Sequence, residues 1–183
     1  MRASSRATEA AGLPFFWGAT SAERSSSYPC DALASPGSCL AVRAVSCAAD
    51  PDGVFGWLCQ LRRAPYSYDL LDNFGRRSPR ALRADLLDLH DGQTFMTIFT
   101  LVGHVQGRSI TLALKPGLPT AVFGPLVCTY EVRPDTAGSR LLCALQVPLV
   151  GAIAPHLRRR LLCWGDLVMM RKQLLTLAAL SRS

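Results

Sequence analysis

"PHLRRRLLCWGDLVMMRKQLLTLAAL", residues 155–180, is the stretch of this 183-residue chain that decides its fold. Pro155 suits the first turn of a helix, and the apolar residues that follow recur at intervals of three and four, as in an amphipathic helix. At ~1.5 Å per residue this helix would extend over roughly 37 Å, long enough to cross a whole sheet. We expect its apolar stripe to face that sheet. The stripe consists of Leu157, Leu161, Trp164, Val168, Leu175 and Ala178, widened by Leu167, Leu174 and Leu177.

Four segments before this helix have the pattern of strands. Residues 93–104 and 108–115 are joined by a short turn with Gly107, and residues 121–132 and 139–147 by a turn that contains Pro, Asp and Gly. Connections of this length join antiparallel neighbours. Every second residue is apolar, so each set should line one face of its strand. The sets are Ile110, Leu112 and Leu114; Leu126, Cys128, Tyr130 and Val132; and Leu141, Cys143, Leu145 and Val147.

The sequence before these strands predicts one further strand and one short helix. Residues 39–48 are rich in small and β-branched residues, which favours a strand. Asp50 can cap the helix that follows, and Pro51 suits its first position. The helix should end near Arg63, because Pro65 follows. The stretch that begins at Pro65, "PYSYDLLDNFGRRSP", then lies in a long connection between this helix and the sheet.

The order of these elements predicts an α+β fold. One sheet face needs cover and one long amphipathic helix is available, so the simplest packing is a curved antiparallel sheet wrapped around the C-terminal helix. Residues 1–36 are rich in Ala and Ser, and we predict that they form a flexible or loosely docked N-terminal extension. Residues 37–183 are predicted to form the domain itself.

This order of elements resembles the helix-grip fold of the SRPBCC superfamily, also called START-like. The resemblance covers residues 38–180 and is closest to bacterial SRPBCC proteins of mostly unassigned function. It is carried by "DPDGVFGWLCQLRRAPYSYDLLDNFGRRSPR" (50–80) and by the C-terminal helix. In that group the stretch after the first helix often reads Tyr-Ser-Tyr-Asp-Trp followed by Asp-Asn. This chain matches at 66–69 and 72–73, but Leu70 stands where Trp is usual.

The resemblance implies a cavity between the sheet and the long helix that takes a small hydrophobic or aromatic molecule. The apolar strand faces agree with this function, since small-molecule pockets are apolar with sparse polar groups. A closed core without room for a ligand is the alternative. The predicted ligand-binding residues are Tyr66, Tyr68, Asp69, Asn73, Arg76, Leu112, Tyr130, Leu145, Trp164 and Leu167.

An enzyme of the polyketide cyclase or dehydratase type is a second interpretation of the same stretch. Such chemistry needs a general acid or base beside a carbonyl, and Tyr68, Asp69 and Asp72 are the candidates. The simpler interpretation is that these aspartates pair with Arg76 and Arg77 and brace the connection. The sequence has no phosphate-binding loop or zinc motif, and its three histidines are scattered, so we expect neither a cofactor nor a metal site.

A basic accessory protein without a small ligand is the third interpretation. The formal net charge is +7, and Lys115 and Lys172 are the only lysines among twenty basic residues. Arginine clusters can bind phosphate, but aspartates surround the cluster at 76–83 and few aromatic residues are available for base stacking. Nucleic acid is therefore an unlikely partner. Nothing in the sequence decides the oligomeric state.

The cysteines and the apolar runs indicate where in the cell the protein is expected. The seven cysteines form no CxxC or CxxH pair, and several lie inside apolar runs. We expect reduced, mostly buried thiols, which are typical of a cytoplasmic protein. The longest apolar run, residues 141–155, contains Gln146, Pro148 and Gly151, and it is shorter than the ~20 residues that cross a bilayer. We therefore expect no membrane span.

Overall fold

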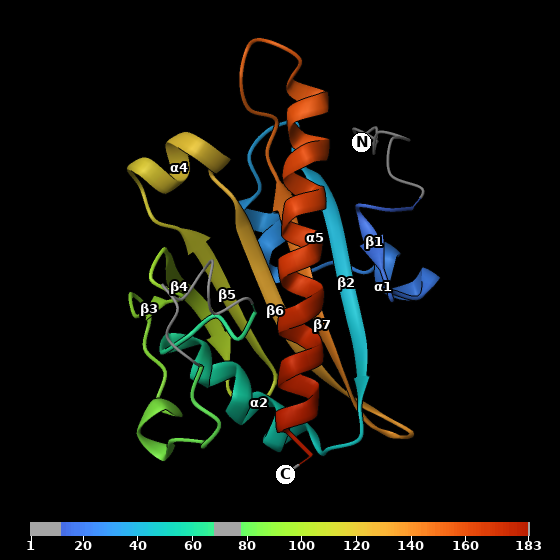
Figure 1. Cartoon of the computed structure of the whole chain (residues 1–183), viewed down its shortest axis with the longest axis vertical. Helices are drawn as coiled ribbons and strands as arrows, with labels where there is room; N and C mark the ends of the chain where they lie inside the picture. Colours follow the sequence, from blue (N-terminus) through green and yellow to red (C-terminus); the bar gives the residue numbers. More distant parts are fainter. Residues whose placement is uncertain (1–11, 68–77, 183) are drawn as a thin grey trace.

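The computed structural model describes residues 12–67 and 78–182, in which a long helix lies across one face of a seven-stranded sheet (Figure 1). The helix, α5, extends over Pro155–Leu180, as the sequence predicted. The strands follow the order β1-β2-β7-β6-β5-β4-β3 across the sheet. The fold is therefore α+β, with a curved sheet that grips its C-terminal helix.

The sheet is antiparallel between every pair of neighbours except one. The exception is β1, which pairs parallel to β2 and makes the sheet mixed. The two longest pairings join β7 to β2 and to β6, and the first extends from Cys39 opposite Val147 to Cys47 opposite Ser139. The strands are β1 (Phe16–Trp17), β2 (Cys39–Cys47), β3 (Thr94–Phe95), β4 (Phe99–Val105), β5 (Ser109–Leu114), β6 (Val127–Asp135) and β7 (Gly138–Val147).

Two of the predicted strands differ from the structure. The segment 93–104 divides into β3 and β4, because Met96 (φ 44°) and Thr97 (φ 66°) leave the extended conformation. The segment 121–132 becomes a strand only at Val127, since helix α4 (Leu118–Phe123) precedes it. Pro119 within the first turn of α4 and glycines with positive φ at both of its ends favour this short helix over a strand.

Helix α2 (Pro51–Cys59) closes one end of the sheet face that carries α5 (Figure 1). Asp50 caps it as predicted, since its carboxylate accepts a hydrogen bond of 2.8 Å from the Gly53 amide. The helix continues into the 3-10 turn η2 (Gln60–Arg62), so the predicted end near Arg63 is confirmed. Another 3-10 turn, η3 (Ala84–Leu86), lies between η2 and β3 in the chain.

The predicted apolar stripe of α5 is wrong for most of its residues. Leu157, Leu161, Trp164, Val168 and Leu175 are exposed, whereas only Ala178 and the widening leucines are buried. The face that is buried includes two polar side chains, so the apolar pattern of the sequence did not reveal it. They are satisfied: Arg159 donates to the Gly37 carbonyl and Gln173 accepts from Tyr130. The buried residues of α5 are Arg159, Cys163, Leu167, Met170, Gln173, Leu174, Leu177 and Ala178.

Residues 12–36 are docked on the sheet: β1 pairs with β2, and the segment from Ala19 to Leu33 packs on the face opposite α5. They contain β1, α1 (Ser21–Ser25) and the 3-10 turn η1 (Pro29–Leu33). Cys30 and Tyr28 are buried there with Val42 and Leu142 of the sheet. The Ala- and Ser-rich composition hid these few well-placed anchors. The earlier part of the extension, residues 1–11, lies outside the described residues.

Candidate functional site

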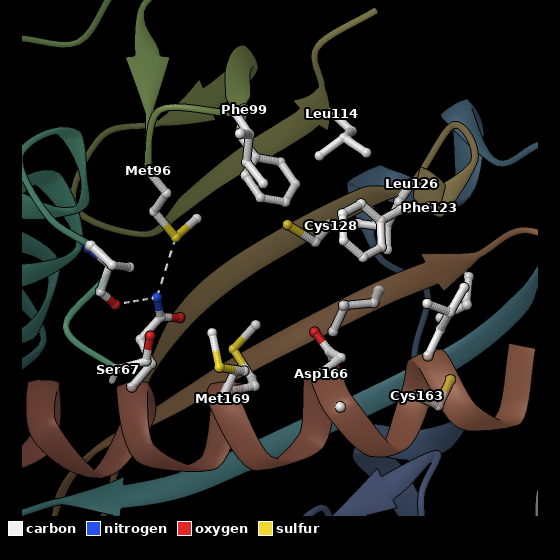
Figure 2. Close-up of a pocket in the computed structure, with 18 of the residues that line it drawn as sticks. Ser67, Met96, Phe99, Leu114, Phe123, Leu126, Cys128, Cys163, Asp166 and Met169 are labelled. Atoms are coloured by element: carbon white, nitrogen blue, oxygen red, sulfur yellow. Dashed lines mark hydrogen bonds between the residues drawn. The ribbon is translucent and has the colours of Figure 1, made fainter. Parts of the chain in front are cut away.

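A cavity of about 520 Å³ separates α5 from part of the sheet (Figure 2). Its walls come from α5, from β4 to β7, from α4 and from the segment that follows η2. The register of the sheet places alternate residues of β5, β6 and β7 on this face, so Leu114, Cys128 and Leu145 reach the same hollow. The alternation of apolar residues along these strands, which predicted one inward face for each, therefore also explains this wall of the cavity.

The lining is mostly apolar and unusually rich in sulfur. Phe99, Phe123 and Leu126 form much of the wall opposite α5 (Figure 2). Thioether and thiol side chains are soft and adaptable, and methionine in particular fits ligands of irregular shape. The sulfur-bearing residues that line the cavity are Met96, Cys128, Cys163, Met169 and Met170.

One end of the cavity is closed by a network of hydrogen bonds between β6, α5 and the segment after η2. The Tyr130 hydroxyl donates to Gln173 Oε1 at 2.6 Å, and Gln173 Nε2 donates to the Pro65 carbonyl. The same amide lies 3.2 Å from Met96 Sδ (Figure 2). Burial raises the pKa of Tyr130 well above its usual value, which keeps the hydroxyl protonated as a donor.

An ion pair whose arginine is fully buried lies at the α5 wall of the cavity. Arg43 of β2 is fully buried, and its Nη2 lies 3.0 Å from Asp166 Oδ2. Arg43 also donates to the carbonyls of Phe15 and Pro14 at 2.9 and 3.0 Å. Its guanidinium group is therefore bound by two carbonyl oxygens in addition to the carboxylate. Asp166 projects from α5 into the cavity, and its side chain keeps 27% exposure (Figure 2).

Desolvation dominates the ionisation of Asp166. Burial raises the pKa of its carboxyl above the usual value, and the nearby Arg43 charge opposes that shift only in part. A carboxyl with a raised pKa in an apolar cavity can accept a hydrogen bond from a ligand and can also hold a proton. Among the described residues that line the cavity, it is the only Asp or Glu.

The thiols near the cavity are poor nucleophiles. Burial raises the pKa of Cys163 to about 11 and that of Cys143 well above its usual value. Because the thiolate is the reactive form, both side chains behave as small apolar groups at neutral pH. All seven cysteines of the chain are free, and all except Cys39 are buried, as predicted.

The residues predicted from the sequence divide into three groups. Tyr130 and Leu145 line the cavity. Tyr66, Leu112, Trp164 and Leu167 do not. Tyr68, Asp69, Asp72, Asn73 and Arg76 lie outside the described residues, although Ser67, directly before them, lines the cavity.

Each residue that misses the cavity does so for a physical reason. Leu112 is fully buried in the core, and Leu167 packs at 5% exposure away from the hollow. Tyr66 is buried with its ring edge against Trp57, at 6.0 Å between centroids. Trp164 points to solvent at 43% exposure, because it lies on the face of α5 that is turned away from the sheet. The sequence had predicted the opposite face.

Sequence reasoning missed the charged residues of the site. Asp166 is the only acidic residue after position 135, and it interrupts an apolar helix. Arg43 likewise interrupts an apolar strand. A charge of each sign inside two elements predicted to pack on each other was the signal that could have found this pair.

Two features are not found in the described part of the chain. Across residues 12–67 and 78–182, no three His, Cys, Asp or Glu side chains are grouped so that they could hold a metal ion. Within the same residues no helix has both the length and the apolar character to cross a membrane.

Comparison with known proteins finds similarity in structure alone. No protein-family model matches the chain, and no curated protein matches it. Protein NE0264 from Nitrosomonas europaea is similar at 14% identity and a TM-score of 0.48, over 78% of this chain and 94% of that one. Protein CV1439 from Chromobacterium violaceum matches at 16% identity and 0.49, over 79% and 97%. Protein SA2116 from Staphylococcus aureus, of unknown function, matches at 12% and 0.49, over 80% and 97%.

Proposed function

We propose that the protein binds a small hydrophobic or aromatic molecule in the cavity between α5 and the sheet. The observation that supports this most is the cavity itself, because about 520 Å³ falls within the range of ligand pockets and its wall is apolar with few polar groups. We further propose that the chain is an SRPBCC protein, as the resemblance at residues 50–80 implies. The free thiols also favour a reducing, cytoplasmic setting.

The size and chemistry of the cavity favour a ligand with one polar group. Burial of about 200 Å² of apolar ligand surface contributes about 5 kcal/mol, which alone corresponds to roughly sub-millimolar binding. Stronger binding needs a directed contact. Asp166 is the charged group that the described residues place in the wall, so a hydroxyl or amine on the ligand would add both affinity and orientation.

An enzyme of the polyketide cyclase type is the second candidate, and the raised pKa of Asp166 favours it. A carboxyl that holds its proton more tightly than usual can act as a general acid or base on a carbonyl compound in the cavity. Its test is turnover: if the bound molecule leaves the protein chemically unchanged after prolonged incubation, the protein is a binder.

Gly165 offers a way to test the binding proposal without disturbing the core. It lies within α5, lines the cavity, and a Cβ placed on it would meet no atom within 4 Å. We expect Gly165→Phe to place a ring at the cavity while the protein still folds. Gly165→Ala is the matched control, since it removes the helix penalty of glycine, about 0.5–1 kcal/mol, and adds only one methyl group.

The measurement is native mass spectrometry of protein purified from its native host. The wild-type chain and Gly165→Ala should carry a small molecule, and Gly165→Phe should carry much less of it. In titrations with the fluorescent probe anilinonaphthalene sulfonate, the wild type and Gly165→Ala should likewise bind the probe more strongly than Gly165→Phe. Bare protein in all three cases, together with no probe binding, would contradict the proposal. Equal ligand in all three would place the binding site elsewhere.

A further inference from the structure

Apolar side chains surround one end of the cavity and point outward. They belong to three neighbouring segments: α4, the connection 148–154, and the first two turns of α5. The segments are tied together, since Arg158 Nη2 donates to the Val122 carbonyl at 2.6 Å and Gly124 packs directly against Val150 and Pro148. Figure 1 shows α4 and the connection before α5 at the same end of the molecule. We call this surface the mouth patch. Its exposed apolar residues are Leu118, Val122, Phe123, Leu149, Ile153, Leu157 and Leu161.

The mouth patch is continuous with the cavity wall and protrudes from the surface. Phe123 and Leu161 line the cavity and are also 39% and 62% exposed. Leu118 is 78% exposed and Ile153 is 89% exposed, so both project into solvent instead of lining a groove. Large apolar side chains gathered in this way indicate an interaction surface. Projecting side chains suit insertion into a soft medium better than packing into a fixed protein partner.

The charge of the mouth patch has one sign. No Asp or Glu occurs between Asp91 and Glu131 or between Asp135 and Asp166. Arg158 and Arg160 lie on the first turns of α5, and no carboxylate of the described residues pairs with either of them. A second copy of the chain would bring like charges together at this surface. An anionic surface would be complementary to it.

We propose that the mouth patch docks on the surface of anionic lipid bilayers, so that the cavity exchanges its apolar ligand with the lipid phase. Apolar insertion combined with cationic attraction is the pattern of proteins that bind membrane surfaces without spanning them. The identity of the exchanged ligand depends on the proposed function. The docking itself rests only on the mouth patch, and it can be measured with an empty cavity.

The test uses the full chain and two kinds of vesicle, one of pure phosphatidylcholine and one of equal parts phosphatidylcholine and phosphatidylglycerol. In co-sedimentation the wild type should bind the anionic vesicles, bind the neutral ones far less, and dissociate as salt is raised. Leu118→Glu and Ile153→Glu should each weaken binding at least about tenfold, because each removes an inserted side chain and adds a repelled charge.

The controls carry the same change on apolar residues that are exposed on other parts of the surface. Leu33 in η1 is 51% exposed and Val105, at the far end of the β4–β5 hairpin, is 53% exposed. Leu33→Glu and Val105→Glu should bind vesicles like the wild type. Equal losses in all four variants would show a general charge effect and would overturn the proposal.

Three further outcomes would overturn it. These are no binding to either vesicle, equal binding to both, or a dimer that Ile153→Glu dissociates in sedimentation velocity, which would make a second copy the occupant. A complex with an acidic protein that Ile153→Glu abolishes, in the absence of vesicle binding, would likewise contradict it. Gly165→Phe separates this proposal from the function itself, because it should lose the cavity ligand and keep vesicle binding.

Discussion

The two faces of the sheet are covered in different ways, although both covers are made by the same chain. On the outer face α1 lies on β2 and η1 lies on β6 and β7, and Cys30 is fully buried with a hydrogen bond of 3.0 Å from its amide to Thr129. On the inner face α5 packs closely only through part of its length. Beside Cys128 it leaves a hollow of about 520 Å³.

The same contrast holds for the ion pair on each face. Arg140 of β7 pairs with Glu23 at 2.8 Å on the outer side, where the Gly18 carbonyl and the Ser46 hydroxyl accept its other donors. Arg43 pairs with Asp166 on the inner side, at the cavity wall. The outer face is therefore a closed and satisfied layer. The inner face retains empty volume and a desolvated acid, features that stability alone does not require.

Breaking the inner ion pair should have the largest effect. Asp166→Leu leaves the fully buried Arg43 without its partner, so we expect a loss of about 3–5 kcal/mol in the free energy of unfolding. Glu23→Leu should lose less, about 1–2 kcal/mol, because the Arg140 side chain keeps 17% exposure to solvent, whereas that of Arg43 is fully buried. Urea denaturation of both variants measures the difference.

The double variant Arg43→Met with Asp166→Leu is the control for this prediction. It removes both charges and should recover most of the lost stability. A double variant as unstable as Asp166→Leu alone would mean that lost packing, and not an unpaired charge, explains the effect. A larger loss for Glu23→Leu than for Asp166→Leu would contradict the contrast between the faces.

The two acids should also respond to pH in opposite directions. Burial acts to raise the pKa of Glu23, but its hydrogen bonds with Arg140 and Thr20 prevail and lower it from 4.5. Ionised Glu23 thus stabilises the fold above that pH, and this contribution is lost as the pH falls through the lowered pKa. Burial raises the pKa of Asp166 above 3.8, so its protonated form is favoured by folding and stability falls as the pH rises from 3.8 through the raised pKa.

Glutamine and asparagine variants measured over a pH series can separate these contributions. Relative to the wild type, the stability deficit of Glu23→Gln should shrink as the solution is acidified. That of Asp166→Asn should grow. If both deficits change in the same direction, one of the two pKa shifts has the wrong sign.

Much of the fold could be predicted from the sequence, because each element carries its own local signal. The caps and prolines predicted α2 and α5, and apolar alternation predicted the inward faces of β5, β6 and β7. The face of α5 could not be predicted, since Arg159 and Gln173 are buried by partners distant in the chain. How the segment 12–36 docks could not be predicted for a similar reason, as its few anchors matter only once the sheet exists.

The residues of the candidate site could be predicted only where the alternation of residues along a strand determines which of them face the cavity. Tyr130 and Leu145 line the cavity because strand periodicity places them there. Asp166 was missed because a lone acid on a helix normally faces water. Its position depends on the phase of α5 and on Arg43, more than a hundred residues away in the chain, as the pairing shows.

The central claim is that the inner face is hollow and the outer face is solid, and enlarging one cysteine on each face tests it most directly. Cys128→Leu adds volume toward the cavity and should change the free energy of unfolding by less than about 1 kcal/mol, whereas Cys30→Leu overpacks a filled layer and should lose about 1–3 kcal/mol. Urea denaturation of the two variants under identical conditions is the measurement. A loss for Cys128→Leu as large as that for Cys30→Leu would mean that no usable space lies beneath α5.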